Sequence, residues 1–165
     1  RFADVIRNLL QHEPDALIFV ASTLDTSRLA QQARRLAPEL HRSSSEWAAS
    51  GDALSEMGGR AVDGLLMMHA YDRSDERAAY RQFVADFRAR FQREFGSFSL
   101  LAYDTANVVM TALERQQPGE TIKQALLAHG PYVGVQQSIQ FNATGDATRE
   151  VFFTEIRSGH YHQMR

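Results

Sequence analysis

The first forty residues alternate between helical apolar patterns and one continuous apolar run, and this alternation constrains the fold most. Apolar residues recur at helical spacing between Phe2 and Leu10, and Pro14 ends that pattern. The run ALIFVA at 16–21 is short and continuous, which is typical of a strand covered on both faces. A second helical stripe runs from Leu29 to Leu36. Helix–strand–helix order predicts a parallel sheet with helices on its faces.

The middle of the chain predicts another strand and three helices. Residues 43–59 predict a short strand, a loop and a weak helix, and VDGLLMMHA at 62–70 predicts a clear strand. Ser74 is expected to open a long helix with one apolar face, formed by Tyr80, Phe83, Val84, Phe87 and Phe91. A second long helix is predicted over 99–117.

The last third of the chain changes from helical to alternating patterns. Thr121 and Gln124 have the spacing of a capping box, which predicts a third helix ending at Gly130. Alternating segments at 133–142 and 149–157 flank the turn sequence NATGD and predict two strands. The overall class is therefore α/β.

Composition excludes several classes of partner and site. Eighteen basic and twenty acidic residues give a net charge of -2, so no basic field favours nucleic acid or an anionic membrane. The absence of cysteine excludes disulfides, thiol nucleophiles and cysteine-ligated zinc. No apolar run reaches the roughly 20 residues that span a bilayer. The first ten residues, RFADVIRNLL, do not resemble a signal peptide.

Enzyme signatures are absent from the sequence. No nucleophile elbow, phosphate-binding loop, dinucleotide fingerprint or H-E-x-x-H pattern occurs. His160 and His162 would share one face of a strand, but no third ligand accompanies them, so surface histidines are expected instead of a metal site. We therefore expect no catalytic residue, no metal and no cofactor.

An ordered series of segments resembles a known family. The segments are ALIFVAST at 16–23, SSSEWAAS at 43–50, AVDGLLMMHAYDR at 61–73, FGSFSLLAYDTA at 95–106 and VGVQQSIQFNATGD at 133–146. In order and spacing they resemble the later half of periplasmic solute-binding proteins of the branched-chain amino acid (Leu/Ile/Val) ABC transporter family. The resemblance implies the type I periplasmic-binding-protein fold, in which Rossmann-like lobes are joined by crossover strands, with the first half lacking here.

The same resemblance implies a division of the chain. Residues 1–60 would belong to the later part of the second ligand-binding lobe, and 61–73 would be the hinge crossover. Residues 74–130 would be helices returning to the first lobe. Residues 131–165 would cross back and add the C-terminal strands.

Candidate ligand contacts follow from the resemblance, and each has a structural alternative. Ser22 and Thr23 follow the strand at 16–21 and would point hydroxyls into the cleft, or else cap the next helix together with Asp25. Asp25, Thr26 and Ser27 are the other candidates for that cap. Glu46 and Trp47 follow the next strand, where Trp47 would floor an apolar pocket or cover core.

The remaining candidates lie at the predicted hinge and beyond it. Asp63 falls where amino-acid-binding members often place an acidic residue for the ligand ammonium, and its alternative role is a strand-end turn. Phe98 and Tyr103 flank the start of a long helix, where an aromatic would close over the ligand side chain or pack in the core. Tyr71, at the hinge, is a further candidate.

The resemblance implies extracytoplasmic binding of a small solute, an amino acid or a related metabolite, and its delivery to a membrane permease by closure of two lobes. The alternative is a sensing domain of the same fold coupled to a signalling protein, which a neighbouring signalling domain would indicate. A small α/β enzyme is a third option. Unpaired sheet edges and apolar helix faces would also favour association between copies of such a half-length chain.

Overall fold

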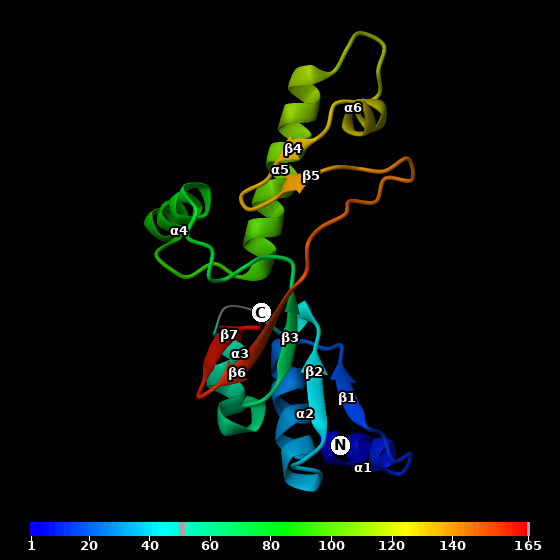
Figure 1. Ribbon diagram of the computed structural model, residues 1–165, viewed down its shortest axis with the longest axis vertical. Coiled ribbons are helices and arrows are strands. Elements are labelled where there is room, and N and C mark those ends of the chain that lie inside the picture. The colour runs from blue at the N-terminus through cyan, green and yellow to red at the C-terminus, as the bar shows by residue number, and fades with distance from the viewer. Residues whose placement is uncertain (50–51, 165) are drawn as a thin grey trace. The chain divides into compact units, whose positions relative to one another are not determined.

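The computed structural model describes residues 1–49 and 52–164. The chain forms two compact units (Figure 1). Unit 1 consists of residues 1–70 and 151–165, and unit 2 consists of residues 71–150. The chain therefore passes between the units twice, at 70–71 and at 150–151. The last residue of SSSEWAAS, Ser50, lies outside the described residues.

Unit 1 is a five-stranded sheet with helices. Its strands are β1 (Ala16–Phe19), β2 (His41–Ser44), β3 (Leu66–His69), β6 (Phe152–Arg157) and β7 (His160–Gln163), and they lie side by side in that order. β1, β2 and β3 are parallel, β6 pairs antiparallel with β3, and β7 pairs antiparallel with β6. The helices are α1 (Phe2–Leu10), α2 (Thr23–Leu36), α3 (Ala53–Gly58) and the short 3-10 helices η1 (Glu46–Ala48) and η2 (Gly59–Val62).

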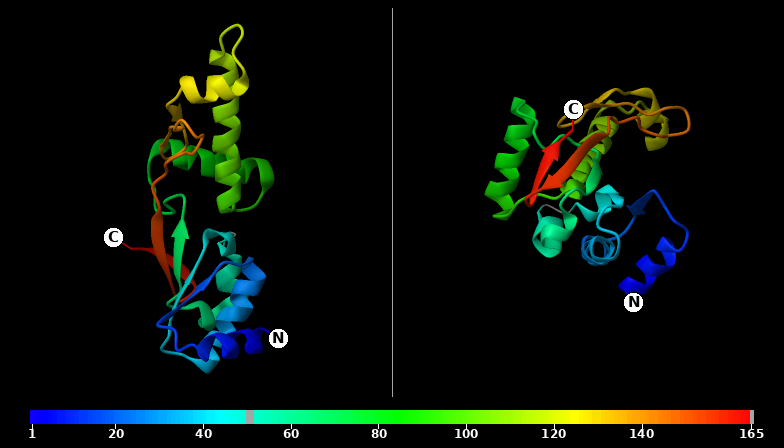
Figure 2. Two further views of the ribbon diagram at one scale, coloured as in Figure 1. Left: turned by 90° about the vertical axis from the view of Figure 1, so that its right-hand side faces the viewer. Right: turned by 60° about the horizontal axis from the view of Figure 1, so that its bottom comes forward.

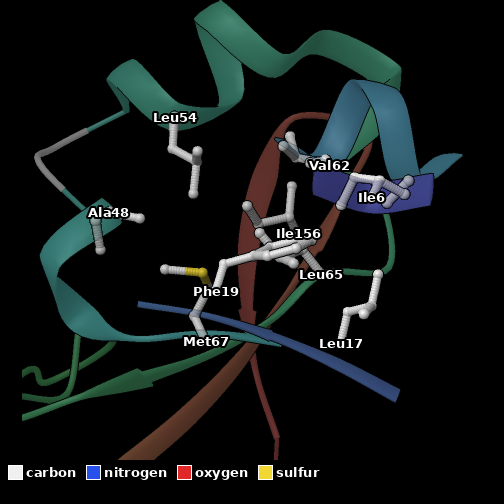
Figure 3. Close-up of a cluster of buried hydrophobic side chains, with 12 residues drawn as sticks. Ile6, Leu17, Phe19, Ala48, Leu54, Val62, Leu65, Met67 and Ile156 are labelled. Carbon is white, nitrogen blue, oxygen red and sulfur yellow. The ribbon is translucent and has the colours of Figure 1, made fainter. Parts of the chain in front are cut away.

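The helices of unit 1 pack on one face of this sheet. Figure 2, left, shows α1, α2 and α3, in blue to teal, on the same side of the strands. Every second side chain of the strands faces these helices, and these side chains form one core. It includes Leu17 and Phe19 of β1, Met67 of β3 and Ile156 of β6 (Figure 3). Burying such side chains stabilises the fold by about 1.5–3 kcal/mol each.

The other face of the sheet is uncovered by the described residues. The expectation that the strand at 16–21 is covered on both faces is therefore wrong, because Ile18 is 74% exposed and Val20 is exposed as well. Met68 of β3 and Phe153 of β6 are opposite one another on that face and are half exposed. An apolar run predicted burial on both faces, whereas the structure buries alternate residues only.

Unit 2 is mainly helical. It contains α4 (Ala78–Phe91), α5 (Ser97–Arg115), α6 (Ile122–Ala128) and a hairpin of two short strands, β4 (Tyr132–Val133) and β5 (Ser138–Ile139). α5 begins and ends two residues before the predicted range 99–117. Thr121 and Gln124 form the predicted capping box, and α6 ends at Ala128 with His129 at its C-cap.

The long helix predicted from Ser74 instead begins at Ala78. The carboxylate of Asp72 accepts hydrogen bonds from the backbone N–H and hydroxyl of Ser74, at 2.8 and 2.7 Å. Asp75 accepts from the backbone N–H of Arg77 at 2.8 Å. These local side-chain bonds compete with helical bonds and keep residues 72–77 out of the helix.

The two predicted C-terminal strands are shorter than their alternating patterns. Within 133–142 the paired residues are Val133 of β4, the two residues of β5 and Phe141, which forms an isolated bridge with Ala147. The second strand begins at Phe152 instead of 149. The NATGD turn between them is correct in kind, because Asn142 Oδ1 accepts the backbone N–H groups of Thr144 and Asp146. Gly145 has a φ of 93°, which favours glycine.

Two apolar clusters and one buried carboxylate hold unit 2 together. Tyr80, Phe83 and Leu100 pack with Tyr71, and Val108 and Ala112 of α5 pack with residues of α6, β4 and β5. Asp104 is buried on α5 between them. It accepts the backbone N–H of Val135 at 2.8 Å and pairs with Arg149 at 3.3 Å. The aromatic stripe predicted for α4 thus contributes to a core.

Candidate functional site

The carboxyl ends of three parallel strands meet at one edge of the unit 1 sheet. β1 and β2 pair in register from Ala16 with His41 to Phe19 with Ser44, and Ser44 pairs with Met67 of β3. The segments that follow these strands therefore leave from the same edge. In open α/β sheets, this edge is where ligands bind.

Ser22 and Thr23 follow β1 at this edge. Ser22 Oγ accepts the backbone N–H of Asp25 at 3.2 Å, so Ser22 is the N-cap of α2. The candidates Asp25, Thr26 and Ser27 lie inside α2, and the hydroxyls of Thr26 and Ser27 donate to the carbonyls of Ala21 and Leu24. The capping role foreseen for Ser22 is confirmed. The helix N-terminus that it caps favours negative charge.

Ser45 and Glu46 follow β2 and brace the same edge. The N–H of Ser45 donates to the Phe19 carbonyl at 3.0 Å, and Glu46 Oε1 accepts the N–H of Ala70 at 3.3 Å. Glu46 thereby joins the segment after β2 to the end of β3. The Ser45 hydroxyl is buried and has no hydrogen-bond partner among residues 1–49 and 52–164. Such a group is costly unless a ligand or water satisfies it.

Trp47 stands out from this edge. Its side chain is 63% exposed, although it follows a buried strand and precedes the buried residues Ala48 and Ala49. The core beneath is filled by Ala48 and Leu54, which Figure 3 shows pointing inward. The core-covering role considered for Trp47 is therefore wrong. An indole ring in this position offers an apolar surface with one hydrogen-bond donor.

Asp63 lies at the other end of the sheet. It precedes β3, whereas Ser22, Glu46 and Trp47 follow β1 and β2, and the length of β3 alone separates the two ends by about 10 Å. Its carboxylate accepts the N–H of Gly159 in the turn between β6 and β7 at 3.3 Å. Asp63 thus occupies the strand-end turn that was its alternative role, at the end of the sheet opposite Trp47.

The amino end of the sheet is crowded with positive charge. The side chain of Arg34 donates to the Asp63 carbonyl at 3.4 Å. Arg42 occupies an inward position of β2, and its burial, followed by the repulsion from Arg34, lowers its pKa. The burial of Arg42 was not predictable, because Arg42 stands in a segment of polar residues.

The three remaining candidates belong to unit 2. Tyr71 is buried, with its ring 5.8 Å from that of Phe95, so the structure places it in the aromatic core. Phe98 is 53% exposed at the start of α5. Tyr103 is half exposed, and its ring lies 5.1 Å from that of Phe83 beside a groove of about 460 Å³. Phe98 and Tyr103 thus keep surfaces that a ligand or another chain can contact.

Other kinds of site find no support in the described part of the chain. His160 and His162 lie exposed on β7, and no cluster of three or more histidines and carboxylates suits a metal ion within residues 1–49 and 52–164. None of the described helices combines the length and the apolar character that crossing a membrane needs.

Comparison with known proteins identifies the family. Residues 1–160 match the model of a family described as periplasmic binding protein. The matched family and the similar solved structures are substrate-binding proteins, not enzymes. Among the curated proteins, none matches.

Solved structures share the fold of this chain. The leucine-binding protein LivK of Thermotoga maritima is 23% identical, with a TM-score of 0.84 over 100% of this chain and 48% of that one. LivJ of Streptococcus pneumoniae, in complex with isoleucine, is 17% identical, with a TM-score of 0.81 over 98% of this chain and 47% of that one. A substrate-binding protein of Desulfitobacterium hafniense, in complex with Leu, is 21% identical, with a TM-score of 0.74 over 99% and 48%. The chain spans about half the length of these proteins, and its fold is the predicted type I periplasmic-binding-protein fold.

Proposed function

Since the chain belongs to the periplasmic binding protein family, we propose that it forms part of an extracytoplasmic protein that binds a small solute at the carboxyl edge of the unit 1 sheet. The exposed indole of Trp47 carries this proposal. It lies where ligands of open α/β sheets bind, and its side chain covers no core. An aromatic surface next to polar groups is typical of a ligand site.

The polar groups at this edge suit an α-amino acid. The N-terminus of α2, capped by Ser22 and continued by Thr23, is suited to a carboxylate. Glu46 is a carboxylate of the same edge and replaces Asp63 as the candidate partner of an ammonium group. The buried hydroxyl of Ser45 would gain a hydrogen-bond partner. Trp47 would pack on an apolar side chain, and the leucine-binding protein LivK and the isoleucine complex of LivJ agree with that choice.

The mechanism that we propose is closure of two lobes on the solute. Closure would surround the ligand with groups from both lobes. The closed form would then present the solute to the permease of an ABC transporter. The family supports both the extracytoplasmic location and the transporter partner.

A thermal-shift panel tests this proposal. Leucine, isoleucine, 4-methylpentanoate, which lacks the ammonium group, and isoamylamine, which lacks the carboxylate, are added to the protein. A ligand present at 100-fold its Kd stabilises the protein by about 2.7 kcal/mol. We expect a shift with the two amino acids and a much smaller one with either analogue.

Two variants locate the site. Trp47→Ala should abolish the shift while changing the stability of the free protein by less than about 0.5 kcal/mol, because the side chain is exposed. Asp63→Ala, at the other end of the sheet, should keep the shift. A shift that survives Trp47→Ala and disappears in Asp63→Ala would overturn the proposed site.

A further inference from the structure

Arg42 is a buried cation whose guanidinium group lacks partners in unit 1. It pairs with Leu17 of β1, and because paired residues point to the same face of a sheet, its side chain lies on the face that the helices cover. Arg42 is only 6% exposed. Its Nε and Nη1 atoms are buried and donate no hydrogen bond within residues 1–49 and 52–164. Since unit 1 itself encloses Arg42, this lack of a partner does not depend on an exposed face of the chain.

A second arginine lies at the same end of the sheet. Nη1 of Arg34, near the C-terminus of α2, lies 3.4 Å from the carbonyl oxygen of Asp63, which precedes β3. The carboxylate of Asp63 is directed to the turn between β6 and β7, where it accepts the N–H of Gly159. Burial of Arg42, followed by repulsion from Arg34, lowers the pKa of Arg42. Two positive charges therefore lie near one another with no carboxylate paired to either in the part of the chain that the structure describes.

This arrangement costs free energy unless a negative group completes it. A buried charge without a counter-charge is unfavourable, and a second positive charge nearby adds to that cost. The C-terminus of α2 attracts positive charge. No described carbonyl of that helix, however, accepts a hydrogen bond from Nε or Nη1 of Arg42. A guanidinium group presents its donors as a planar fork, which matches two oxygens of one oxyanion.

From these observations we propose that Arg42 and Arg34 form a binding site for a small oxyanion at the amino end of the unit 1 sheet. Phosphate, sulfate and a carboxylate share the chemistry that the site needs, which is a negative charge spread over at least two oxygens. Arg34 is exposed and would attract the anion from solvent, and the guanidinium of Arg42 would donate to it. Three residues of extended chain, about 10 Å, separate Arg42 from Ser45 at the proposed solute site.

Anion titrations followed by thermal shift test this site on the whole chain. Phosphate, sulfate and acetate are titrated separately, each against sodium chloride at the same ionic strength. We expect at least one of the three to give a saturable rise in Tm that chloride does not give. The anion with the lowest Kd shows whether the site prefers a tetrahedral or a planar oxyanion.

Two variants and a matched control assign the effect to the arginines. Arg42→Met keeps an unbranched aliphatic side chain but removes the charge and the donors, so it should abolish the rise. Its Tm in chloride should not fall, because a buried charge without a partner is removed. Arg34→Gln should raise the Kd of the anion by about tenfold. Arg35→Gln removes the same charge from the next residue, whose side chain donates to Gln32, and should leave the Kd within about twofold.

Several results would overturn the proposal. One is the absence of a saturable rise beyond that of chloride with all three anions, and another is a rise that persists in Arg42→Met, as a general salt effect would. Equal losses of affinity in Arg34→Gln and Arg35→Gln would overturn it, since net charge alone would then explain them. A lower Tm of Arg42→Met in chloride would overturn it too, because the chain itself would then satisfy the guanidinium. The solute site plays no part in this test, so its failure would leave the proposed function intact.

Discussion

At the scale of single residues, exposure decides between the roles that the sequence left open. Trp47 and Ser22 stand at predicted positions, but only the structure shows that the indole is exposed and that Ser22 caps a helix. Asp63 was misplaced because a carboxylate before a glycine has the same local sequence at either end of a strand. The direction of β3, which depends on contacts distant in sequence, decided its position. Arg42 could not be foreseen, since polarity usually predicts exposure.

Asp75 gives a prediction about pH. Its carboxylate forms an ion pair with Arg77, in which Nη2 of Arg77 lies 2.7 Å from Oδ2 of Asp75. The side chain of Asp75 is almost fully buried, while that of Arg77 is 63% exposed. The hydrogen bonds from Arg77 lower the pKa of Asp75 below its ordinary value. A carboxyl whose pKa is lowered by folding stabilises the protein above its unfolded pKa, and this contribution is lost as the pH falls through the folded pKa.

We therefore expect Asp75→Asn to lower the free energy of unfolding by about 1 kcal/mol at pH 7. The expected loss is this small because Arg77 is exposed and solvent screens its charge. The difference from the original protein should shrink toward zero as the pH is lowered below the ordinary Asp value of 3.8. Urea denaturation at several pH values measures it. Glu76→Gln, at an exposed neighbouring position, should change little at any pH. A difference that grows toward low pH would contradict the assignment.

At the scale of elements, local signals were sufficient where side chains act within a few residues. The capping box of α6 and the asparagine–glycine turn at 142–146 were predictable, because their hydrogen bonds are local. The predicted start of α4, Ser74, is four residues too early. Asp72 and Asp75 accept hydrogen bonds from backbone N–H groups in the segment before the helix. The strand at 16–21 was shorter than its apolar run, which carries no information about what covers each face of a sheet.

The capping box gives the prediction at this scale. Thr121 Oγ1 accepts the N–H of Gln124 at 3.3 Å, and the Gln124 side chain accepts the N–H of Thr121 at 2.7 Å. Thr121→Ala should lower the free energy of unfolding by about 1 kcal/mol. Thr105→Ala, which removes a hydroxyl from the interior of α5, is the control and should change it much less. Urea denaturation measures both variants. An equal loss of unfolding free energy in the two would show that the capping hydrogen bonds do not stabilise the protein.

At the scale of the whole molecule, the fold class and family were predictable, although no single motif was specific. The order and spacing of the segments carried the resemblance, and the family match over residues 1–160 confirms it. The division into ranges around 61–73 and 131–165 was expected from that resemblance, and the structure places its two passages between units at 70–71 and 150–151. The groove along α4 was not foreseen, because its walls come from three segments distant in sequence.

Hydrogen exchange with and without bound ligand maps where the solute binds on the unit 1 sheet. The probe is whichever of leucine and isoleucine stabilises the protein more. Amides that are covered or newly hydrogen-bonded exchange more slowly. A solute bound at the carboxyl edge should slow exchange for residues 20–26 and 43–48, which leave the carboxyl ends of β1 and β2. Exchange should not change for 59–65 or 157–160 at the other end of the sheet. Protection confined to 59–65 and 157–160, with none at 20–26 and 43–48, would contradict a site at the carboxyl edge.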